Sequence, residues 1–454
     1  MNDYVEHIKN ELDSINDMSL DEFNAMRNEK FRKMLSHHYN NTHNAAYREL
    51  LRKHGIESEE DLPKNVAEVN MLPMVDKEFL QRGDFANKPT VPRDEVFKVV
   101  ETSGSTGDPK LLPHSLKAAL RLYGELITRS YLMNNFDLEG EGYWVTHWIP
   151  NGKDVWSSHV AAKMIEKIFE SKVIDETTQT SLDKHIENLL NNNRITRSVS
   201  ASNFYIALAS FAKKQNIDLS RCSLNGVISG GSRITESDRE FVKEGIGLDR
   251  FAQFYVSSET FMMGAEAKEN LQYHLQLDEF IIEIVDKDGN HVRENEKGEV
   301  LVTAFSMDSA PMIRYRISDS AMFLGKSDYI DKFSMLTDIG RVSDAPFGDG
   351  LISYDEIANM PKYMLSKGIP VLAVQIAKQR VDKKDLPIIR IESPVPDYEK
   401  IEALAIEAFT SNNQMKNEIE SGIIHRPKVE LYEPGKLRTG RFKIPLFIDE
   451  TETK

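Results

Sequence analysis

The chain contains one cluster of hydroxyl residues, glycines and a lysine that could bind phosphate. Residues 102–110 read Thr-Ser-Gly-Ser-Thr-Gly-Asp-Pro-Lys. Glycines let the backbone approach a ligand closely, short hydroxyls donate hydrogen bonds, and a lysine supplies a compact positive charge. The candidate triphosphate-binding residues are Thr102, Ser103, Gly104, Ser105, Thr106, Gly107 and Lys110. A plain surface turn is the alternative interpretation of such a cluster.

The segments on either side of this cluster favour a binding loop. A strand-like run, residues 95–101, precedes the loop, and a helix-like run follows it. The residues that fall on one face of that helix are Leu116, Leu120, Tyr123 and Ile127. The lysine is spaced differently from the Walker pattern G-x-x-x-x-G-K-S/T, which disfavours the ordinary P-loop fold.

Bulk properties limit the class of protein. A chain of 454 residues is long for one core and predicts two or three domains. The net charge of −15 argues against nonspecific binding of nucleic acid, so an anionic ligand needs a local positive site. A single cysteine, Cys222, excludes an intrachain disulfide and a cysteine-rich zinc site, and we expect it to pack in the interior. A polar N-terminus and the lack of a long apolar run predict a cytoplasmic protein without stable membrane insertion.

The elements that position the loop follow a mixed α/β pattern. Residues 1–60 are polar and helix-like, and strand-like runs alternate with helix-like ones from 95 to about 335. The clearest predicted strands are 224–229, 280–285 and 299–303.

The loop resembles the S/T-S-G-S/T-T-G-x-P-K signature of the adenylate-forming enzymes, which include acyl-CoA and aryl-CoA synthetases, peptide-synthetase adenylation domains and luciferases. Further partial matches follow in that family's order, over nearly the whole chain. Residues 70–80, Asn-Met-Leu-Pro-Met-Val-Asp-Lys-Glu-Phe-Leu, resemble the L-P-x-x-x-K segment of the phenylacetate-CoA ligase branch. Residues 228–232 resemble the family's adenine-contacting glycine pair, which implies roles for Ser229, Gly230 and Gly231; a simple strand-to-helix turn is the alternative.

The run Tyr255-Val-Ser-Ser-Glu259 resembles the family's Y-G-x-S/T-E motif. The resemblance implies that Tyr255 lies along adenine, that Ser258 meets phosphate, and that Glu259 is catalytic and holds the metal. Val256 replaces the usual glycine. Because a β-branched residue resists positive φ, we expect an altered turn or an ordinary β conformation here. An exposed glutamate at a strand end is the alternative for Glu259.

Two further matches complete the nucleotide site and suggest a hinge. Residues 312–319 resemble Y-R-T-G-D, which implies that Asp319 accepts hydrogen bonds from the ribose hydroxyls, with a solvent-facing turn aspartate as the alternative. Residues 338–344 follow G-R-x-D/K-D, which implies that Arg341 touches the nucleotide and Ser343 is the hinge, although serine replaces the usual charged residue.

The C-terminal run, residues 433–443, resembles the P-G-x-L/I-x-R-S/T-x-G-K segment that carries the family's adenylation lysine. An ungapped match makes Lys443 the catalytic lysine, with Phe442 in place of the preceding glycine. Lys436, Arg438 and Arg441 compete for this role, and a solvated basic tail is the alternative.

The resemblance implies an α/β fold. We expect a large N-terminal adenylation domain of layered mixed sheets and helices at 1–340, with a helical N-terminal part at 1–94. A small, mobile α+β C-terminal domain is expected at 341–454.

The implied activity is AMP-forming activation of a carboxylic acid by ATP and Mg²⁺, then transfer to a thiol, with coenzyme A as co-substrate. Transfer to an amine or carrier protein is an alternative, and so is a noncatalytic homologue that binds nucleotide. A homodimer is one option for assembly.

Other residues could line an acid pocket or be structural. Aromatic candidates for the pocket, which could equally be core, are Trp144, Trp148, Trp156, Phe204, Tyr205 and Phe254. His147 and Lys153 could meet a polar substituent of the acid. We interpret the remaining histidines considered, His37, His38, His43 and His274, as structural.

Overall fold

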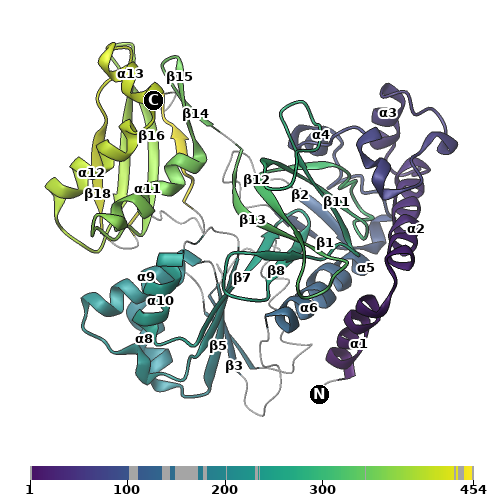
Figure 1. Cartoon of the computed structure of the whole chain (residues 1–454), viewed down its shortest axis with the longest axis horizontal. Coiled ribbons are helices and arrows are strands. Elements are labelled where there is room, and N and C mark those ends of the chain that lie inside the picture. The colour runs from purple at the N-terminus through teal and green to yellow at the C-terminus, as the bar shows by residue number, and fades with distance from the viewer. Residues whose placement is uncertain are drawn as a thin grey trace.

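The computed structural model describes residues 3–101, 111–134, 144–148, 172–176, 181–200, 202–230, 234, 236–342, 344–433, 436–437 and 444–451. A large sheet flanked by helices is followed by a separate four-stranded sheet (Figure 1). The predicted α/β fold is confirmed. Among the described helices, none combines the length and apolarity needed to cross a membrane.

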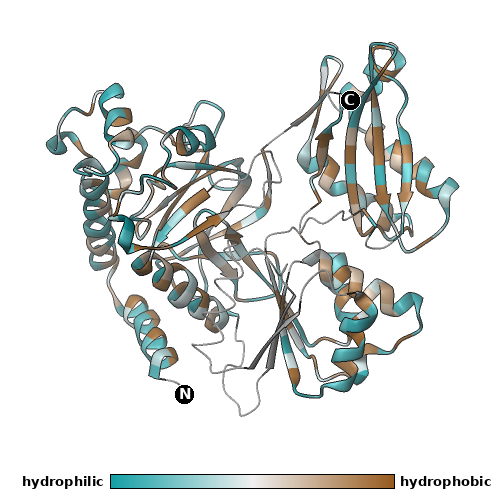
Figure 2. Cartoon of the chain, turned by 180° about the vertical axis from the view of Figure 1, so that it is seen from behind, coloured by the Kyte–Doolittle hydropathy of each residue, from teal (hydrophilic) through white to brown (hydrophobic). Residues whose placement is uncertain are grey.

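The N-terminal part is helical, as predicted. It contains α1 (Asp3–Asp17), α2 (Leu20–Tyr39), α3 (Ala46–Lys53) and α4 (Lys77–Arg82), with short 3-10 helices η1 (Glu59–Asp61), η2 (Val66–Met71) and η3 (Arg93–Glu95). A capping box starts α2: the Glu22 N–H donates to Ser19 Oγ, and the Ser19 N–H donates to the Glu22 carboxylate. Figure 2 shows that these helices carry both polar and apolar residues, as expected of helices that bury one face.

The large sheet has eleven strands among the described residues, in the order β10-β11-β12-β13-β9-β8-β7-β6-β5-β3-β4. Their bounds are β3 (Trp144–Trp148), β4 (Lys172–Glu176), β5 (Ile195–Ser200), β6 (Gly226–Gly230), β7 (Arg250–Ser257), β8 (Phe261–Glu266), β9 (Tyr273–Leu275), β10 (Phe280–Val285), β11 (Lys297–Ala304), β12 (Tyr315–Lys326) and β13 (Ser334–Arg341). Strands β3 to β7 pair in parallel, whereas β7 to β13 pair antiparallel. The three predicted strands lie in β6, β10 and β11 and are confirmed.

Helices α8 (Leu182–Asn191), α9 (Ser202–Lys214) and α10 (Glu236–Ile246) connect the parallel strands, and a short 3-10 helix, η5 (Leu219–Arg221), precedes β6. They share an apolar cluster in which Cys222 is a partly buried neighbour, so the expectation that this cysteine packs is confirmed. Burial also raises the pKa of its thiol.

A separate hairpin frames the predicted phosphate loop. Strands β1 (Val96–Glu101) and β2 (Leu111–Ser115) are antiparallel, and Glu101 pairs with Leu111. The helical segment that follows consists of three consecutive parts: α5 (Leu116–Ala119), a π-helical turn η4 (Leu120–Glu125) and α6 (Leu126–Met133).

The predicted apolar face of that helix is only half right. Tyr123 and Ile127 are buried, but Leu116 and Leu120 are 52% and 47% exposed. A π-helical turn has more residues per turn than an α-helix, so it rotates the helical face away from the expected 3.6-residue period.

The C-terminal part has its own sheet and core, visible as the yellow-green lobe in Figure 1. Its elements are β14 (Asp344–Phe347), β15 (Gly350–Ser353), α11 (Tyr354–Ser366), β16 (Ala373–Val381), β17 (Lys384–Glu392), α12 (Tyr398–Thr410), α13 (Asn413–Glu420), β18 (Lys428–Tyr432) and β19 (Phe447–Asp449). The sheet order is β18-β17-β16-β19. The domain boundary between 340 and 341 would fall at the end of β13, and it stays a prediction.

A buried ionic network holds the N-terminal helices on the sheet. Asp278 Oδ2, in the turn before β10, lies 2.8 Å from Arg129 Nη1 of α6 and 3.1 Å from Arg121 Nη2 of η4. Arg121 also bonds Glu11 of α1 at 3.1 Å, and Lys30 of α2 donates to the Asp278 carbonyl at 2.8 Å. Burial alone would raise the pKa of Asp278, but Arg129, Lys30 and Arg121 outweigh that effect and hold the pKa well below its ordinary value.

Asp278→Asn is expected to lower the free energy of unfolding near pH 7 by roughly 3–5 kcal/mol, because it leaves buried cations without their partner. The folded-state pKa lies below the unfolded value of about 3.9. Ionised Asp278 therefore stabilises the fold above that value, and this contribution is lost as the pH falls through the folded-state pKa. Urea unfolding should show that the difference in free energy of unfolding between wild type and Asp278→Asn becomes smaller below about pH 4. A difference in free energy of unfolding that stays constant with pH would contradict this prediction. The control is Asp331→Asn, which changes an exposed aspartate.

Candidate active site

The predicted nucleotide residues gather where the parallel strands end. Ser229 and Gly230 are the last residues of β6, and they pair with Gln253 and Phe254 of β7. Tyr255 follows directly on β7. The carboxyl ends of parallel strands form the usual ligand crevice of open α/β sheets.

The side chain of Val256 lies close to the backbone of Gly230. A Cβ atom at Gly230 would lie 3.1 Å from Val256 Cγ2, closer than most real contacts. Val256 lies within β7 and has no positive φ, so of the two predicted alternatives the β conformation is the one found, next to a shift in register in the pairing with β8. Glycine at position 230 thus leaves room for the branched residue that replaces the family's glycine.

A buried polar network underlies this strand end. Gln253 Nε2 donates to Ser202 Oγ at 2.7 Å and to Ser229 Oγ at 2.9 Å, and Tyr273 OH donates to Gln253 Oε1 at 2.8 Å. The Ser229 hydroxyl is therefore engaged inside the protein. Nothing in the local sequence pattern marks Gln253, Tyr273 or Ser202, so none of the three was predicted.

Two tyrosine–carboxylate hydrogen bonds join β7 and the turn after it to β12. Tyr255 OH donates to Asp319 Oδ2 at 3.1 Å, and Tyr315 OH donates to Glu259 Oε1 at 3.2 Å. Each segment contributes one tyrosine and one carboxylate, four positions apart, and all four residues are buried. The bonds are thus reciprocal, and they bring Tyr255, Glu259 and Asp319 together. Tyr315 was not predicted as a site residue, although it lies inside the motif that supplies Asp319.

These bonds require the large sheet to fold back on itself. Three strands, β8, β9 and β13, lie between β7 and β12 in the strand order. In a flat sheet the two strands would be about 19 Å apart, at about 4.8 Å per strand. The short β9, which pairs with β13 at only Met335 and Leu336, is where the pairing is thinnest.

The turn that carries Ser258 and Glu259 is tightly held. Ser257 Oγ accepts from the N–H groups of Glu259, at 3.2 Å, and Thr260, at 3.1 Å. Phe261 then has φ of +61°, which is strained for an aromatic residue and costs of order 1–3 kcal/mol. Its ring packs on Tyr123, with centroids 4.3 Å apart. This packing helps to hold the strained turn.

A second strained residue precedes Asp319. Ser318 has φ of +64°, at the position where the Y-R-T-G-D pattern has glycine. Asp319 pairs with Arg341 across β12 and β13, so the backbone places these two predicted residues side by side. Gly340 is also constrained, because a Cβ atom there would clash with Asp355 Oδ1 at the start of α11.

The predicted residues 102–110, Gly231, Ser343 and Lys443 lie outside the described residues. On either side of the segment that contains Lys443, described residues form hydrogen bonds with the C-terminal sheet. Glu392 Oε2 accepts from the Leu437 N–H at 3.1 Å, and Gln375 Nε2 donates to the Pro445 carbonyl at 3.0 Å.

The aromatic candidates divide into two groups. Phe204 and Tyr205 lie in the apolar cluster around α9, and Tyr205 OH donates to Ser198 Oγ at 2.9 Å, which favours a core role. Phe254 packs edge-on to Tyr131, with centroids 5.6 Å apart, at the predicted site. Trp156 and Lys153 lie outside the described residues, as do the side chains of Trp144, His147 and Trp148.

The histidines with described contacts bond within the protein. His37 and His38 lie 2.7 and 3.0 Å from the carbonyls of Asp308 and Met307, and His274 Nδ1 lies 2.7 Å from Ser327 Oγ. Burial lowers the pKa of His38 to about 3. Within the described ranges, no group of three or more His, Cys, Asp or Glu residues is arranged to bind a metal.

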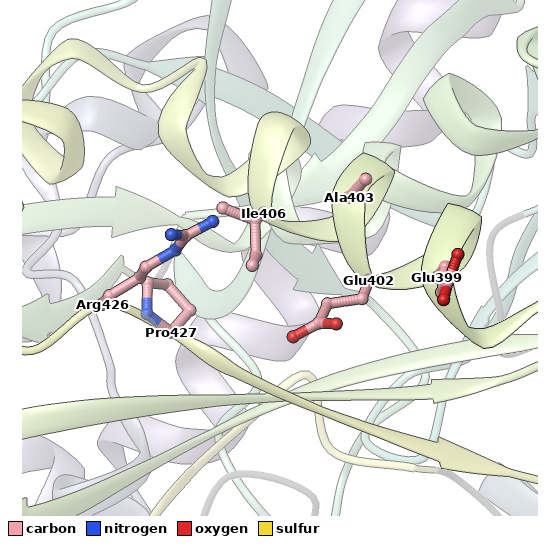
Figure 3. A pocket seen from close by; sticks show the side chains of 6 residues that line it. All are labelled: Glu399, Glu402, Ala403, Ile406, Arg426 and Pro427. Carbon is pink, nitrogen blue, oxygen red and sulfur yellow. The ribbon is translucent and has the colours of Figure 1, made fainter.

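One hollow of about 450 Å³ lies on the C-terminal part (Figure 3). Its lining comes from α12 and from the two residues before β18, and consists of Glu399, Glu402, Ala403, Ile406, Arg426 and Pro427. It contains none of the predicted site residues.

The fold agrees with comparisons to known proteins. Residues 32–307, more than half of the chain, match the AMP-binding enzyme family, so the chain belongs to that family. Within the adenylate-forming superfamily it falls in the phenylacetate-CoA ligase-like branch. It is 22% identical over 444 residues to the phenylacetate-coenzyme A ligase of Thermus thermophilus, covering 91% of this chain and 93% of that protein.

Solved structures share the fold. A 2-hydroxyisobutyryl-CoA ligase in a postadenylation state with its acyl-AMP aligns with a TM-score of 0.71 at 18% identity, covering 93% of this chain and 88% of that one. The acyl acid amido synthetase GH3.15 aligns with a TM-score of 0.65 at 16% identity, covering 94% and 93%.

Ser318→Gly is expected to raise the free energy of unfolding by up to about 1 kcal/mol, because glycine adopts positive φ without steric strain. The greater freedom of glycine in the unfolded chain offsets part of this gain. Ser320→Gly, two residues along the same strand and without positive φ, is the matched control and should be destabilising. Urea unfolding measures both variants. Equal destabilisation of the two would show that the conformation of Ser318 is not strained.

Proposed function

We propose that this protein activates a carboxylic acid with ATP to form an acyl-adenylate, releasing pyrophosphate, and then transfers the acyl group to coenzyme A. The observation that carries the proposal is the reciprocal pair of tyrosine–carboxylate bonds. They hold Asp319 and Glu259 at the carboxyl end of the parallel strands, beside Tyr255. A site of this kind offers one carboxylate to ribose and another to the phosphate end of a nucleotide.

In the proposed ground state, Asp319 accepts hydrogen bonds from the ribose hydroxyls, and the Tyr255 ring lies along adenine. The backbone of Ser229, Gly230 and Gly231 borders the base. Residues 102–110 hold the β and γ phosphates, to which Ser258 adds a hydroxyl. Arg341, whose backbone pairs with Asp319, contributes positive charge to the nucleotide.

Glu259 fits a magnesium ion chemically, because a carboxylate oxygen together with substrate phosphates is the usual environment of Mg²⁺. Glu259 is held through its Oε1 by Tyr315 and through its N–H by Ser257. When bound, the ion would neutralise phosphate charge. The positive charge supplied by the protein would come from Lys110, Arg341 and Lys443, which matters in a chain whose net charge is −15.

The first step joins a carboxylate oxygen of the acid to the α-phosphorus of ATP and breaks the bond to pyrophosphate. Reactions of this type depend on positioning and on neutralising charge. Lys443 would contact the carboxylate and α-phosphate oxygens. In the second step, the thiolate of coenzyme A attacks the acyl carbon and AMP leaves, so no cysteine of the protein is required. Ser343 would be the hinge for rearranging the C-terminal part between the two steps.

Pyrophosphate release with ATP and Mg²⁺ tests the proposal directly. Phenylacetate is the first acid to try, because the relative named above is a phenylacetate-coenzyme A ligase. Short, medium and long-chain acids complete the panel, each with and without coenzyme A. Sustained release that depends on coenzyme A is expected. Release that stops at bound adenylate would replace coenzyme A by another acceptor, such as an amine or carrier protein. ATP binding without release would support a noncatalytic homologue.

Lys443→Ala is expected to slow acyl-adenylate formation by roughly 10²- to 10³-fold, because it removes a positive group from the reacting oxygens. Conversion of supplied acyl-adenylate by coenzyme A should change much less. Lys436→Ala changes the exposed lysine that competes for this role in the same segment, and it should retain near-normal rates in both steps; a loss of adenylation in Lys436→Ala instead would move the role to Lys436. A normal adenylation rate in Lys443→Ala would refute the assignment of this lysine.

A further inference from the structure

The side chain of Tyr315 is buried, and its hydroxyl contacts Glu259, the proposed metal ligand. The side chain has 0% exposure, and its hydroxyl donates to Glu259 Oε1 at 3.2 Å. The two residues are 56 positions apart in sequence. A phenol enclosed by the core has little freedom to move, so it is a rigid donor.

The backbone of Tyr315 is fixed on both sides. On one side it pairs with Val302 of β11. On the other it bridges Val75, whose N–H donates to the Arg314 carbonyl at 3.1 Å and whose carbonyl accepts from the Arg316 N–H at 2.8 Å. The segment that resembles the L-P-x-x-x-K pattern therefore supports Tyr315 directly.

Arg314 reinforces this support. Its guanidinium donates to the carbonyls of Asn70 and Leu72 at 3.1 and 2.8 Å, and it pairs with the buried Glu283 at 3.0 Å. The residue takes φ of +46°, so the chain accepts backbone strain at this point. The result is a continuous set of contacts from residues 70–75, through Arg314 and Tyr315, to Glu259.

We propose that Tyr315 is a positioning residue that holds the Glu259 carboxylate in the orientation that receives the Mg²⁺ of MgATP. The inference rests on the proposed function, in which Glu259 is the metal ligand. A carboxylate on a turn has several rotamers, and a hydrogen bond from a fixed phenol selects among them. Partners that orient metal ligands typically contribute about 10- to 100-fold in metal affinity.

The reciprocal bond provides an internal comparison. Tyr255 donates to Asp319, the proposed ribose ligand, just as Tyr315 donates to Glu259. The two hydroxyls should therefore affect different parts of MgATP. Loss of the Tyr255 hydroxyl should act on the nucleoside, and loss of the Tyr315 hydroxyl should act on the metal.

The test is a Mg²⁺ titration of pyrophosphate release by Tyr315→Phe, using the acid that gives the highest rate in the panel. We expect the half-saturating Mg²⁺ concentration to rise about 10-fold or more. The rate should recover at high Mg²⁺. The KM for ATP at saturating Mg²⁺ should change less than about threefold, because Tyr315→Phe leaves the proposed direct contacts to the nucleotide unchanged. Tyr255→Phe should raise the KM for ATP and leave the Mg²⁺ curve unchanged.

Tyr47→Phe is the matched control. Tyr47 is also fully buried, and within the described part of the chain its hydroxyl has no hydrogen-bond partner. Removing that hydroxyl tests the general effect of a tyrosine-to-phenylalanine change in the core. Urea unfolding of all three variants confirms that each is folded before it is titrated.

The outcomes separate this inference from the proposed function. An unchanged Mg²⁺ curve for Tyr315→Phe, with an active wild-type enzyme, overturns the role of Tyr315 alone. If wild type releases no pyrophosphate with any acid, the proposed function fails. Calorimetry of ATP binding with and without Mg²⁺ then tests Tyr315 separately: a smaller Mg²⁺-dependent gain in affinity for Tyr315→Phe supports the inference, and an equal gain overturns it.

Discussion

The site depends on the reciprocal hydrogen bonds that join β7 and the turn after it to β12. Tyr255 binds Asp319, and Tyr315 binds Glu259, so neither segment can shift without disturbing both carboxylates. A buried carboxylate needs a donor to offset the loss of hydration, and a buried phenol needs an acceptor. Each pair meets both needs at once. The large sheet must fold back on itself to allow this, because three strands separate β7 from β12.

Strained backbone surrounds the same residues. Phe261 follows the turn of Glu259, Ser318 precedes Asp319, and Arg314 precedes Tyr315, and all three have positive φ. Such conformations persist only where the surrounding packing fixes them. Here the packing is visible, in the ring of Tyr123 against Phe261 and in the bonds of Arg314 to the segment before α4. The chain therefore gives up some stability to fix the direction of two carboxylates.

Much of the fold could be predicted because its signals are local. Strands β6, β10 and β11 are short apolar runs, and β1 precedes a loop that its glycines and hydroxyls make recognisable, whereas its hairpin partner β2 was not predicted. The helix after that hairpin was predicted only in part. Its π-helical turn at Leu120–Glu125 breaks the 3.6-residue period, and a π-helical turn has no clear sequence signature.

The sequence by itself determined the family, the order of the motifs and the identity of Glu259 and Asp319 as candidate ligands. These follow from residue types at fixed spacings along the chain. Only the tertiary structure decided that Tyr315 supports Glu259, that Gln253 engages the Ser229 hydroxyl, and that Gly230 makes room for Val256. The physical reason is that such contacts join residues on different strands, so their partners depend on how the sheet pairs and bends.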